Sequence, residues 1–437
     1  MEIILSLLYT ALFIILIYKI NFFEVDGLSR KTLSALFILK IIFGLAVWFV
    51  YTFYYTDRSA NDVFKFFDDG AIMFSAIYQH PMHYLQMVLG IDTNAPYLEP
   101  YYKKMANWYK PWAAATYHNN RIIIQFNAIV YLFSFGYYNV HTVFMSFLSF
   151  VGLTGIYKIF IPLLKDKKRE LAIAVFLIPS ALFWGSGVLK EGITLFSLGM
   201  MLFFFYQYVF IQKTLKYLVW IIFTALILAF TKIYVFVAIF PSLVALVIIK
   251  KFNIKRMFIL FLLIHLLFFF ISVNLYQLNP EWDILKTLSH KQWSLTTIAE
   301  DQNAGSLITT KVLESTTISF IKNAPEAIIN TLFRPTIVES KTLFMFVSGL
   351  ENLFFVIVIL ISLFFLKIPP KKSLPLFFTS IFFVITLALL IGIVNPVLGS
   401  IVRFRIPLLP FFAIIFIVLI DKQKLVIKFP FLQTILK

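Results

Sequence analysis

The stretch DRSANDVFKFFDDGAIMF, residues 57–74, carries four aspartates among aromatic side chains. If residues 61–77 form a helix, Asp62, Phe66 and Asp69 share one face, because residues four and seven positions apart project from the same side. A carboxylate presented in this way can act as a general base. We predict Asp62 as the catalytic base, with Asp69 as the second candidate. A capped helix in a solvated loop is the alternative interpretation for each aspartate taken singly.

A charged pair, Lys190–Glu191, separates two apolar runs at 171–187 and 193–210. Charges at membrane depth are costly unless paired or wetted, so they mark functional candidates. In a turn between two spans the cost is modest. We predict Glu191 as a second acidic site residue and Lys190 as a phosphate contact. The alternative is that Lys190 extends toward water and Glu191 begins a helix, where the helix dipole favours an acid.

Two arginines, Arg403 and Arg405, lie in NPVLGSIVRFRIPLLP near the end of the chain, and Arg334 lies in LFRP. Arginine binds phosphate through two parallel hydrogen bonds, so we predict that these three residues bind a lipid phosphate. Pairing of Arg403 and Arg405 with a carboxylate in a loop remains the structural alternative.

The composition indicates what must position these residues. The chain has 437 residues, of which 61% are hydrophobic and 14% charged, and its mean hydropathy is +0.89. Soluble domains are about 45–50% apolar and about 25% charged. Repeated windows of roughly 20 apolar residues match the thickness of a bilayer. We predict an all-α, polytopic transmembrane helical bundle forming a single domain over residues 1–437.

The basic residues set the predicted orientation. The net charge is +17, but lysines and arginines cluster in short loops between apolar runs, which the positive-inside rule explains without a nucleic acid partner. Apart from Lys232, which falls at a turn, we expect the charges to lie at the span ends. About eleven spans are expected. Their approximate ranges are 3–19, 33–55, 139–161, 171–187, 192–211, 216–231, 233–249, 257–275, 348–367, 373–394 and 404–420.

The rule places the basic loops on the cytoplasmic side, and this orientation leaves two long extracytoplasmic loops, 56–138 and 276–347. Within the first loop, residues 121–135 are apolar, but this segment is shorter than the roughly 20 residues of a membrane span. We predict a juxtamembrane or re-entrant helix there, since such elements are tolerated where protein or water covers them. The orientation also places the candidate residues on the outer face.

The chain offers little evidence for a cofactor. It has no cysteine, and so no thiolate metal site or cysteine nucleophile. His80 and His83 are close in sequence but lack a metal-site motif, so we expect no metal and regard structural roles as the main interpretation of the histidines. A divalent metal is possible but not indicated. No phosphate-binding glycine loop is present.

The order of these features resembles the GT-C superfamily of membrane glycosyltransferases, which use polyprenyl-phosphate-linked sugars. Asp62, Phe66, Gly70 and Ala71 look like the acidic element of that superfamily's first outer loop. The basic turn KDKKRE, the helix AVFLIPSALFWGSG and then Glu191 follow in matching order. The ending RFRIPLLP is similar to the Arg-x-Arg-x-Pro ending of bacterial members. The similarity covers most of the chain, but as topology and short degenerate motifs.

The resemblance implies an enzyme of the bacterial inner membrane with an extracytoplasmic active site. Its partners would be the lipid bilayer, a polyprenyl-phosphate-linked sugar and a glycan, lipid or protein acceptor of the cell envelope. Three features depart from the pattern: a Lys–Glu pair where the second outer loop often has Asp, an additional N-terminal span, and the absence of a WWD signature. A flippase or transporter of lipid-linked glycans, and an envelope-polysaccharide polymerase or ligase, remain alternatives.

Overall fold

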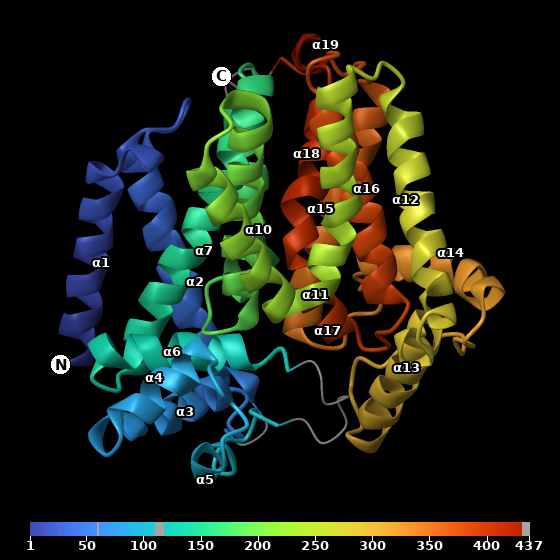
Figure 1. Ribbon diagram of the computed structural model, residues 1–437. Helices are drawn as coiled ribbons and strands as arrows, with labels where there is room; N and C mark the ends of the chain where they lie inside the picture. Colours follow the sequence, from blue (N-terminus) through green and yellow to red (C-terminus); the bar gives the residue numbers. More distant parts are fainter. Residues whose placement is uncertain (59–60, 110–117, 431–437) are drawn as a thin grey trace. The chain divides into compact units, whose positions relative to one another are not determined.

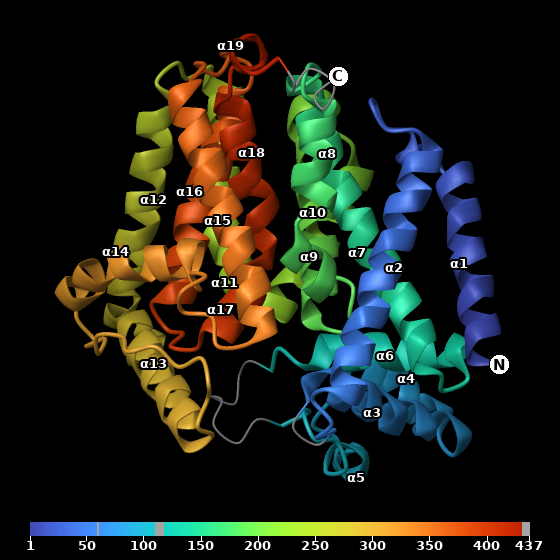
Figure 2. The same ribbon diagram turned by 180° about the vertical axis from the view of Figure 1, so that it is seen from behind.

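The computed structural model describes residues 1–58, 61–109 and 118–430. Within these ranges the chain is helical, with three isolated β-bridges and no strand (Figures 1 and 2). Eight helices in the described part are long and apolar enough to cross a membrane, and a bent pair, α17 and α18, would make nine. The chain is therefore all-α, with the long apolar helices expected of a helical membrane bundle.

The chain divides into two compact units, each built from two separate stretches. The first comprises residues 1–159 and 181–233, and the second comprises 160–180 and 234–437. No polar linker marks this division in the sequence, which explains why one continuous domain was predicted. The division passes through α7 (Tyr138–Phe160), α9 (Pro179–Trp184) and α11 (Leu215–Phe252) rather than through a loop.

The first unit contains seven complete helices besides most of α7 and the first part of α11. Figure 1 shows α3, α4 and α6 lying across the ends of the upright helices α1, α2 and α7 of this unit. Its helices are α1 (Glu2–Lys19), α2 (Arg30–Phe53), α3 (Asp62–Ser75), α4 (Pro81–Leu89), α5 (Glu99–Tyr102), α6 (Arg121–Ser134), α7 (Tyr138–Phe160) and α10 (Lys190–Tyr206).

Helix α3 forms because its buried residues recur at helical spacing, and this face packs along α6. At Gly70 the two helices approach so closely that a Cβ would lie 2.6 Å from the Cβ of Asn127. The predicted short element at 121–135 is this separate 14-residue helix α6. It ends with Phe135 and Gly136 both in left-handed conformation, at φ 51° and 82°.

Helices α7 and α10 approach each other just as closely. A Cβ on Gly199 would lie 2.0 Å from the carbonyl oxygen of Gly152. Small residues permit such backbone contact between membrane helices. This packing fixes the axis of α10 and therefore the position of Lys190 and Glu191 at its first turn.

The second unit holds upright apolar helices together with α13 and α14, which occupy the predicted second loop, 276–347. Helix α14 packs on α16, where a Cβ on Gly392 would lie 2.0 Å from the carbonyl oxygen of Ala327. Its helices are α8 (Lys168–Phe176), α12 (Met257–Asn274), α13 (Ile284–Asp301), α14 (Thr317–Phe333), α15 (Leu343–Phe364), α16 (Leu374–Gly392), α17 (Leu398–Phe404), α18 (Leu409–Leu419) and α19 (Lys422–Lys428).

One predicted span, 171–187, is divided between two helices in the structure, and two others, 216–231 and 233–249, belong to one helix with a break. The range 171–187 is divided between α8 and α9 (Pro179–Trp184), because the residue before a proline is disfavoured in helical conformation. Helix α11 (Leu215–Phe252) covers both 216–231 and 233–249, but Lys232 within it has non-helical dihedral angles, φ −148° and ψ 83°. The break lies at the residue where the sequence predicts a turn.

Candidate functional site

Asp62 is the first residue of α3 and lies next to Asn61 at the helix N-cap position. The amide of Asn61 donates to the carbonyl oxygen of Tyr55, 2.6 Å away, which ties the helix start to the end of α2. Asp62 is partly exposed, whereas Phe66 and Asp69 on the same face are buried. The predicted helix and the shared face are thus present.

Asp69 is 1% exposed and holds a loop in place. Its two carboxylate oxygens accept hydrogen bonds from the backbone N–H groups of Ala106, at 2.7 Å, and Asn107, at 2.8 Å. Burial raises the pKa of Asp69 to about 6, against the opposing effect of these two hydrogen bonds. The carboxyl group therefore titrates near neutral pH while it fixes the backbone at 106–107.

Lys190 is buried at the start of α10, on the same side of the unit as this loop. Its Nζ donates to the side-chain oxygens of Asn120, at 2.8 Å, and Asn119, at 3.4 Å. The same Nζ lies 5.5 Å from the ring centroid of Phe66, within the range of a cation–π contact. The cation is thus held against the predicted acidic face of α3.

Asn120 links Lys190 to the loop that Asp69 holds. Its amide nitrogen donates to the carbonyl oxygen of Asn107, 3.2 Å away, while its oxygen accepts from Lys190. Asp69, Asn107, Asn120 and Lys190 therefore form one continuous polar chain running from α3 to α10. We therefore expect a change at either end to affect the other through these hydrogen bonds.

Glu191 is fully buried and forms an ion pair with Lys232, whose Nζ lies 2.8 Å from its Oε1. The sequence places Glu191 in a turn of modest cost, but the structure puts it in the first turn of a buried helix. The pairing with Lys232 explains how both charges are tolerated. It also explains the break in α11, because Lys232 occupies the non-helical residue there.

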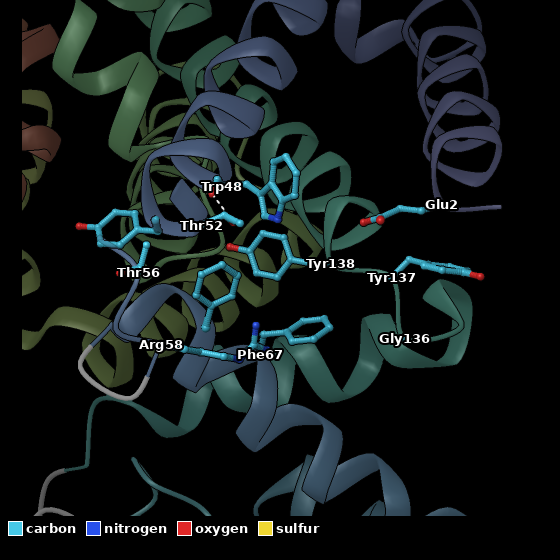
Figure 3. Close-up of a pocket in the computed structure, with 11 residues that line it drawn as sticks. Glu2, Trp48, Thr52, Thr56, Arg58, Phe67, Gly136, Tyr137 and Tyr138 are labelled. Carbon is cyan, nitrogen blue, oxygen red and sulfur yellow. Dashed lines mark hydrogen bonds between the residues drawn. The ribbon is translucent and has the colours of Figure 1, made fainter. Parts of the chain in front are cut away.

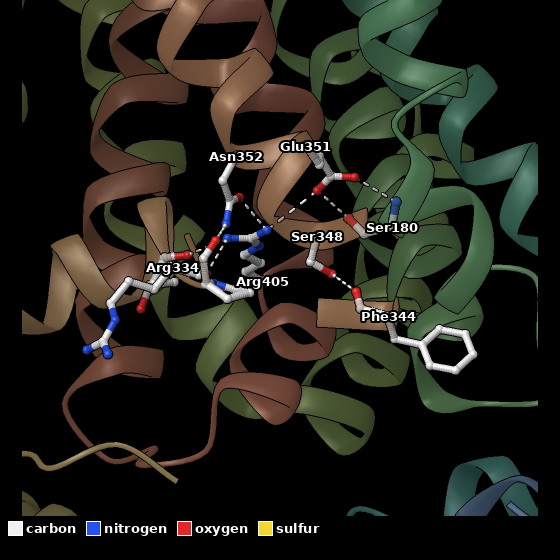
Figure 4. Close-up of polar contacts among 9 residues, drawn as sticks. Ser180, Arg334, Phe344, Ser348, Glu351, Asn352 and Arg405 are labelled. Atoms are coloured by element: carbon white, nitrogen blue, oxygen red, sulfur yellow. Dashed lines mark hydrogen bonds and ion pairs between the residues drawn. The ribbon is translucent and has the colours of Figure 1, made fainter. Parts of the chain in front are cut away.

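In the second unit, Arg405 is 0% exposed, and its guanidinium is enclosed by partners from α14 and α15 (Figure 4). One terminal nitrogen donates to the carbonyl oxygens of Thr331, at 3.0 Å, and Arg334, at 3.1 Å. The other donates to Asn352 Oδ1, at 2.7 Å, and to Glu351, at 3.5 Å. Arg405 is thus paired with a carboxylate, as in the structural alternative, but Glu351 lies inside helix α15 and not in a loop.

Glu351 connects this cluster to the break between α8 and α9. Its carboxylate accepts from the backbone N–H of Ser180, at 2.8 Å, and from the Ser180 hydroxyl, at 2.7 Å. Asn352 donates to the carbonyl oxygen of Pro335, at 2.7 Å. Four separated parts of the second unit are therefore joined at Arg405, Glu351 and Asn352.

Arg334 lies at the end of α14 and forms an ion pair with Glu339. Partial burial opposes ionisation of Glu339, but hydrogen bonds from Arg334 and Thr336 keep its pKa below the usual range. Arg403 lies in the last turn of α17 and is partly exposed, in contrast to Arg405 two residues later. Only the Arg405 guanidinium is fully enclosed among these three predicted phosphate contacts.

The predicted site residues thus fall into two groups. Asp62, Asp69, Lys190 and Glu191 belong to the first unit, where the polar chain joins Asp69 to Lys190. Arg334, Arg403 and Arg405 belong to the second unit, where Arg405 donates to the backbone of Arg334.

The sequence prediction missed buried charges inside helices. The expectation that Lys232 alone lies away from a span end is wrong, because Lys40 is buried in the middle of α2 and Glu351 is buried in α15. Glu351 was placed near an end because α15 was expected to start at residue 348 rather than Leu343. A charge in an apolar run was the available signal for both. No feature of the sequence indicates the hydrogen bonds that Asn119 and Asn120 accept from Lys190.

Among the described residues, no group of three His, Cys, Asp or Glu side chains is arranged to hold a metal ion. His80 and His83 lie together, with ring centroids 4.5 Å apart, and His83 stacks on Tyr97. Comparison of the chain with protein families, curated proteins and solved structures finds no match in any of the three.

Proposed function

We propose that the protein is a GT-C-type membrane glycosyltransferase of the bacterial inner membrane. It would move a sugar from a polyprenyl-phosphate donor to a cell-envelope acceptor on the extracytoplasmic side. The observation that carries the proposal is the meeting of α3 with the start of α10. There Lys190 lies against Phe66, on the face that also bears Asp62 and Asp69. A carboxylate base and a nearby cation are the groups that such a transfer requires.

The reaction assigned to this region is a direct group transfer. Asp62 takes the proton of an acceptor hydroxyl, whose oxygen forms a bond to the anomeric carbon of the sugar. The bond from that carbon to the phosphate oxygen breaks, and polyprenyl phosphate leaves with the electron pair. Lys190 stabilises the charge that develops on the leaving phosphate. Glu191, which is buried and paired with Lys232, orients the sugar or its acceptor indirectly, by fixing the start of α10 at Lys190.

The remaining residues receive supporting roles in the proposal. Asp69 positions the loop at 106–107 and remains the reserve base, since its raised pKa suits proton transfer near neutral pH. Arg403 and Arg334 contact lipid phosphate groups in the second unit. Arg405 is assigned to positioning, because it is fully buried, unlike Arg334 and Arg403, and its hydrogen bonds are directed to protein oxygens.

The proposed topology has about eleven crossings, the length of each being set by the bilayer. Helix α11 is counted as two crossings that meet at Lys232, and α8 with α9 as one broken crossing. The bent pair α17 and α18 forms the last. Broken helices within a membrane are tolerated where protein covers the released backbone groups. Glu351, which accepts the N–H of Ser180, covers one such group.

The test is transfer by purified protein incubated with a panel of polyprenyl-phosphate sugars and cell-envelope acceptors. The variant Asp62→Asn should lose at least about 100-fold in rate, the usual contribution of a general base. Asp301→Asn, at the exposed end of α13, is the matched control and should keep the rate of the unaltered chain. A folded Asp62→Asn protein with full transferase activity would refute the base assignment.

A second candidate, a flippase or transporter of lipid-linked glycans, is favoured by one observation. Lys40, Glu191 and Glu351 are buried within or at the start of apolar helices, and Lys232 and Arg405 are buried at helix breaks. Ionisable residues inside membrane segments often mark transport pathways. Proteoliposomes separate the two candidates: a transporter moves an intact lipid-linked glycan between leaflets without forming a new glycosidic bond, whereas a transferase forms that bond.

A further inference from the structure

A cavity of about 480 Å³ opens in the first unit where α2 ends and α7 begins (Figure 3). This volume falls within the range of about 300–1,000 Å³ typical of small-molecule sites. Aromatic side chains form most of its wall, among them Trp48 from α2, Phe67 from α3 and Tyr138 from α7. Arg58 and Glu2 supply charged groups at its edge.

The cavity is separate from the proposed reaction site because the two use opposite faces of α3. Phe64 and Phe67 line the cavity, whereas Asp62, Phe66 and Asp69 share the other face. At 3.6 residues per turn these two sets project in opposite directions. Occupation of the cavity therefore does not require occupation of the proposed reaction site.

Tyr138 gives independent evidence that the cavity is built for a ligand. Its side chain is 8% exposed, and although the Val188 backbone N–H lies near its hydroxyl, that hydroxyl forms no hydrogen bond of normal geometry with the described residues. Figure 3 shows this hydroxyl directed toward Thr52, beside Trp48. A buried hydroxyl without a partner is costly, so a ligand that donates to it or accepts from it gains affinity.

The charges around the cavity narrow the class of ligand. The Arg58 guanidinium is bound by both oxygens of Asp68, at 3.0 and 2.5 Å, and lies 4.4 Å from the ring centroid of Phe64. Glu2 adds a carboxylate whose Oε1 accepts from the backbone N–H of Asn139. With its arginine neutralised and a second carboxylate present, this wall disfavours an anionic phosphate.

We propose that this cavity binds a neutral saccharide of one or two sugar rings. The C–H faces of a sugar ring pack on aromatic side chains, while its hydroxyls bond to groups of either polarity. The cavity offers both: the rings of Trp48, Phe64 and Phe67, and the polar groups of Tyr138 and Glu2. This binding site is independent of the proposed transfer reaction.

The test is binding of soluble sugars to the full chain in nanodiscs, without any lipid-linked donor. Glucose, galactose, N-acetylglucosamine and lactose are titrated by calorimetry and by saturation-transfer NMR. Inorganic phosphate and choline are titrated as anionic and cationic probes. At least one sugar should bind saturably, and neither phosphate nor choline should displace it. Absence of sugar binding, or displacement by either charged probe, would overturn the proposal.

Three variants locate the binding in the cavity. Tyr138→Phe removes only the unpartnered hydroxyl and should weaken binding about 3- to 10-fold, the range of one neutral hydrogen bond, without lowering the melting temperature. Tyr78→Phe is the matched control, because Tyr78 is 79% exposed in the same unit and does not line the cavity, so the affinity of this variant should be unchanged. Thr56→Trp, at an exposed lining position, should fill the opening and abolish binding.

Equal affinity of the Tyr138→Phe and Tyr78→Phe variants, or full binding by Thr56→Trp, would place the sugar elsewhere and overturn the assignment. A lower melting temperature for Tyr138→Phe would show that its hydroxyl has a structural partner, which also contradicts the proposal. Because no donor lipid is present in these assays, failure of the transferase proposal leaves their outcome unchanged.

Discussion

Each unit contains a buried cation with several partners, but the two cations are held in different ways. Lys190 donates to the amide oxygens of Asn119 and Asn120 and lies against the ring of Phe66. Arg405 donates to two backbone carbonyls, to Asn352 and to Glu351. Lys190 therefore rests among side chains that can adjust, whereas Arg405 joins backbone segments that must stay fixed. We propose that the first cluster belongs to the reaction site and that the second holds the fold together.

The largest effect is expected from Arg405→Met. The substitution leaves Glu351 buried without its cation and two carbonyls without a donor, so unfolding should become easier by about 3–5 kcal/mol. Thermal unfolding in detergent measures this loss. Arg405→Lys keeps the charge but loses the planar guanidinium. Its melting temperature should therefore lie between those of the unaltered chain and of Arg405→Met. Lys424→Gln, at an exposed position, is the control.

An unchanged melting temperature for Arg405→Met would contradict the architectural role. It would mean that the hydrogen bonds around this guanidinium contribute nothing measurable, and Arg405 would return to the group of predicted phosphate contacts.

The ion pair between Glu191 and Lys232 sharpens the comparison, because it belongs to the unit that holds the proposed reaction site and is nevertheless buried. Glu191→Gln or Lys232→Met alone should cost about 3–5 kcal/mol, since each leaves one buried charge unpaired. The double variant removes both charges and should recover most of that loss. The transfer rate of the double variant should remain at least about 100-fold below that of the unaltered chain, because the group proposed to orient the reactants is missing. Restored transfer in the double variant would make Glu191 purely structural.

Asp69 predicts a dependence on pH. Its folded-state pKa of about 6 lies above the ordinary value of 3.8, so the folded protein favours the protonated carboxyl. The Asp69 carboxyl therefore contributes about 3 kcal/mol to the free energy of unfolding. This contribution is complete below about pH 4 and is lost as the pH rises through about 6. Melting temperatures of the unaltered chain and of Asp69→Asn are measured from pH 4 to 7. Relative to Asp69→Asn, the unaltered chain should lose stability as the pH rises. A difference independent of pH would contradict the raised pKa.

The smallest effect is expected from Asn120→Ala, which breaks the polar chain at its middle. One bond to a charged group and one to a backbone carbonyl are lost, while Asn119 still accepts from Lys190. Stability should fall by about 1–2 kcal/mol. Asn21→Ala, at an exposed site, is the control. A transfer rate equal to that of the control would separate Lys190 from the loop held by Asp69.

The helical class and the helix at 62–75 were predictable because apolar runs and the spacing of residues such as Phe66 and Asp69 are local properties. The break at Lys232 was predictable for the same reason, since a charge interrupts the run. Partners distant in sequence were not predictable. Glu351 is bonded to Ser180, 171 residues away, and Glu191 to Lys232, 41 residues away. Such contacts follow from packing between helices, which periodicity does not reveal.

The most direct measurement is the rate of sugar transfer from a polyprenyl-phosphate donor by two variants, each corrected for folded protein. Glu191→Gln combined with Lys232→Met should lose at least about 100-fold in rate. Arg405→Lys should keep a rate close to that of the unaltered chain, because its role is to hold the fold. The opposite ranking, with Arg405→Lys inactive and the double variant active, would contradict the division between a functional and an architectural cluster.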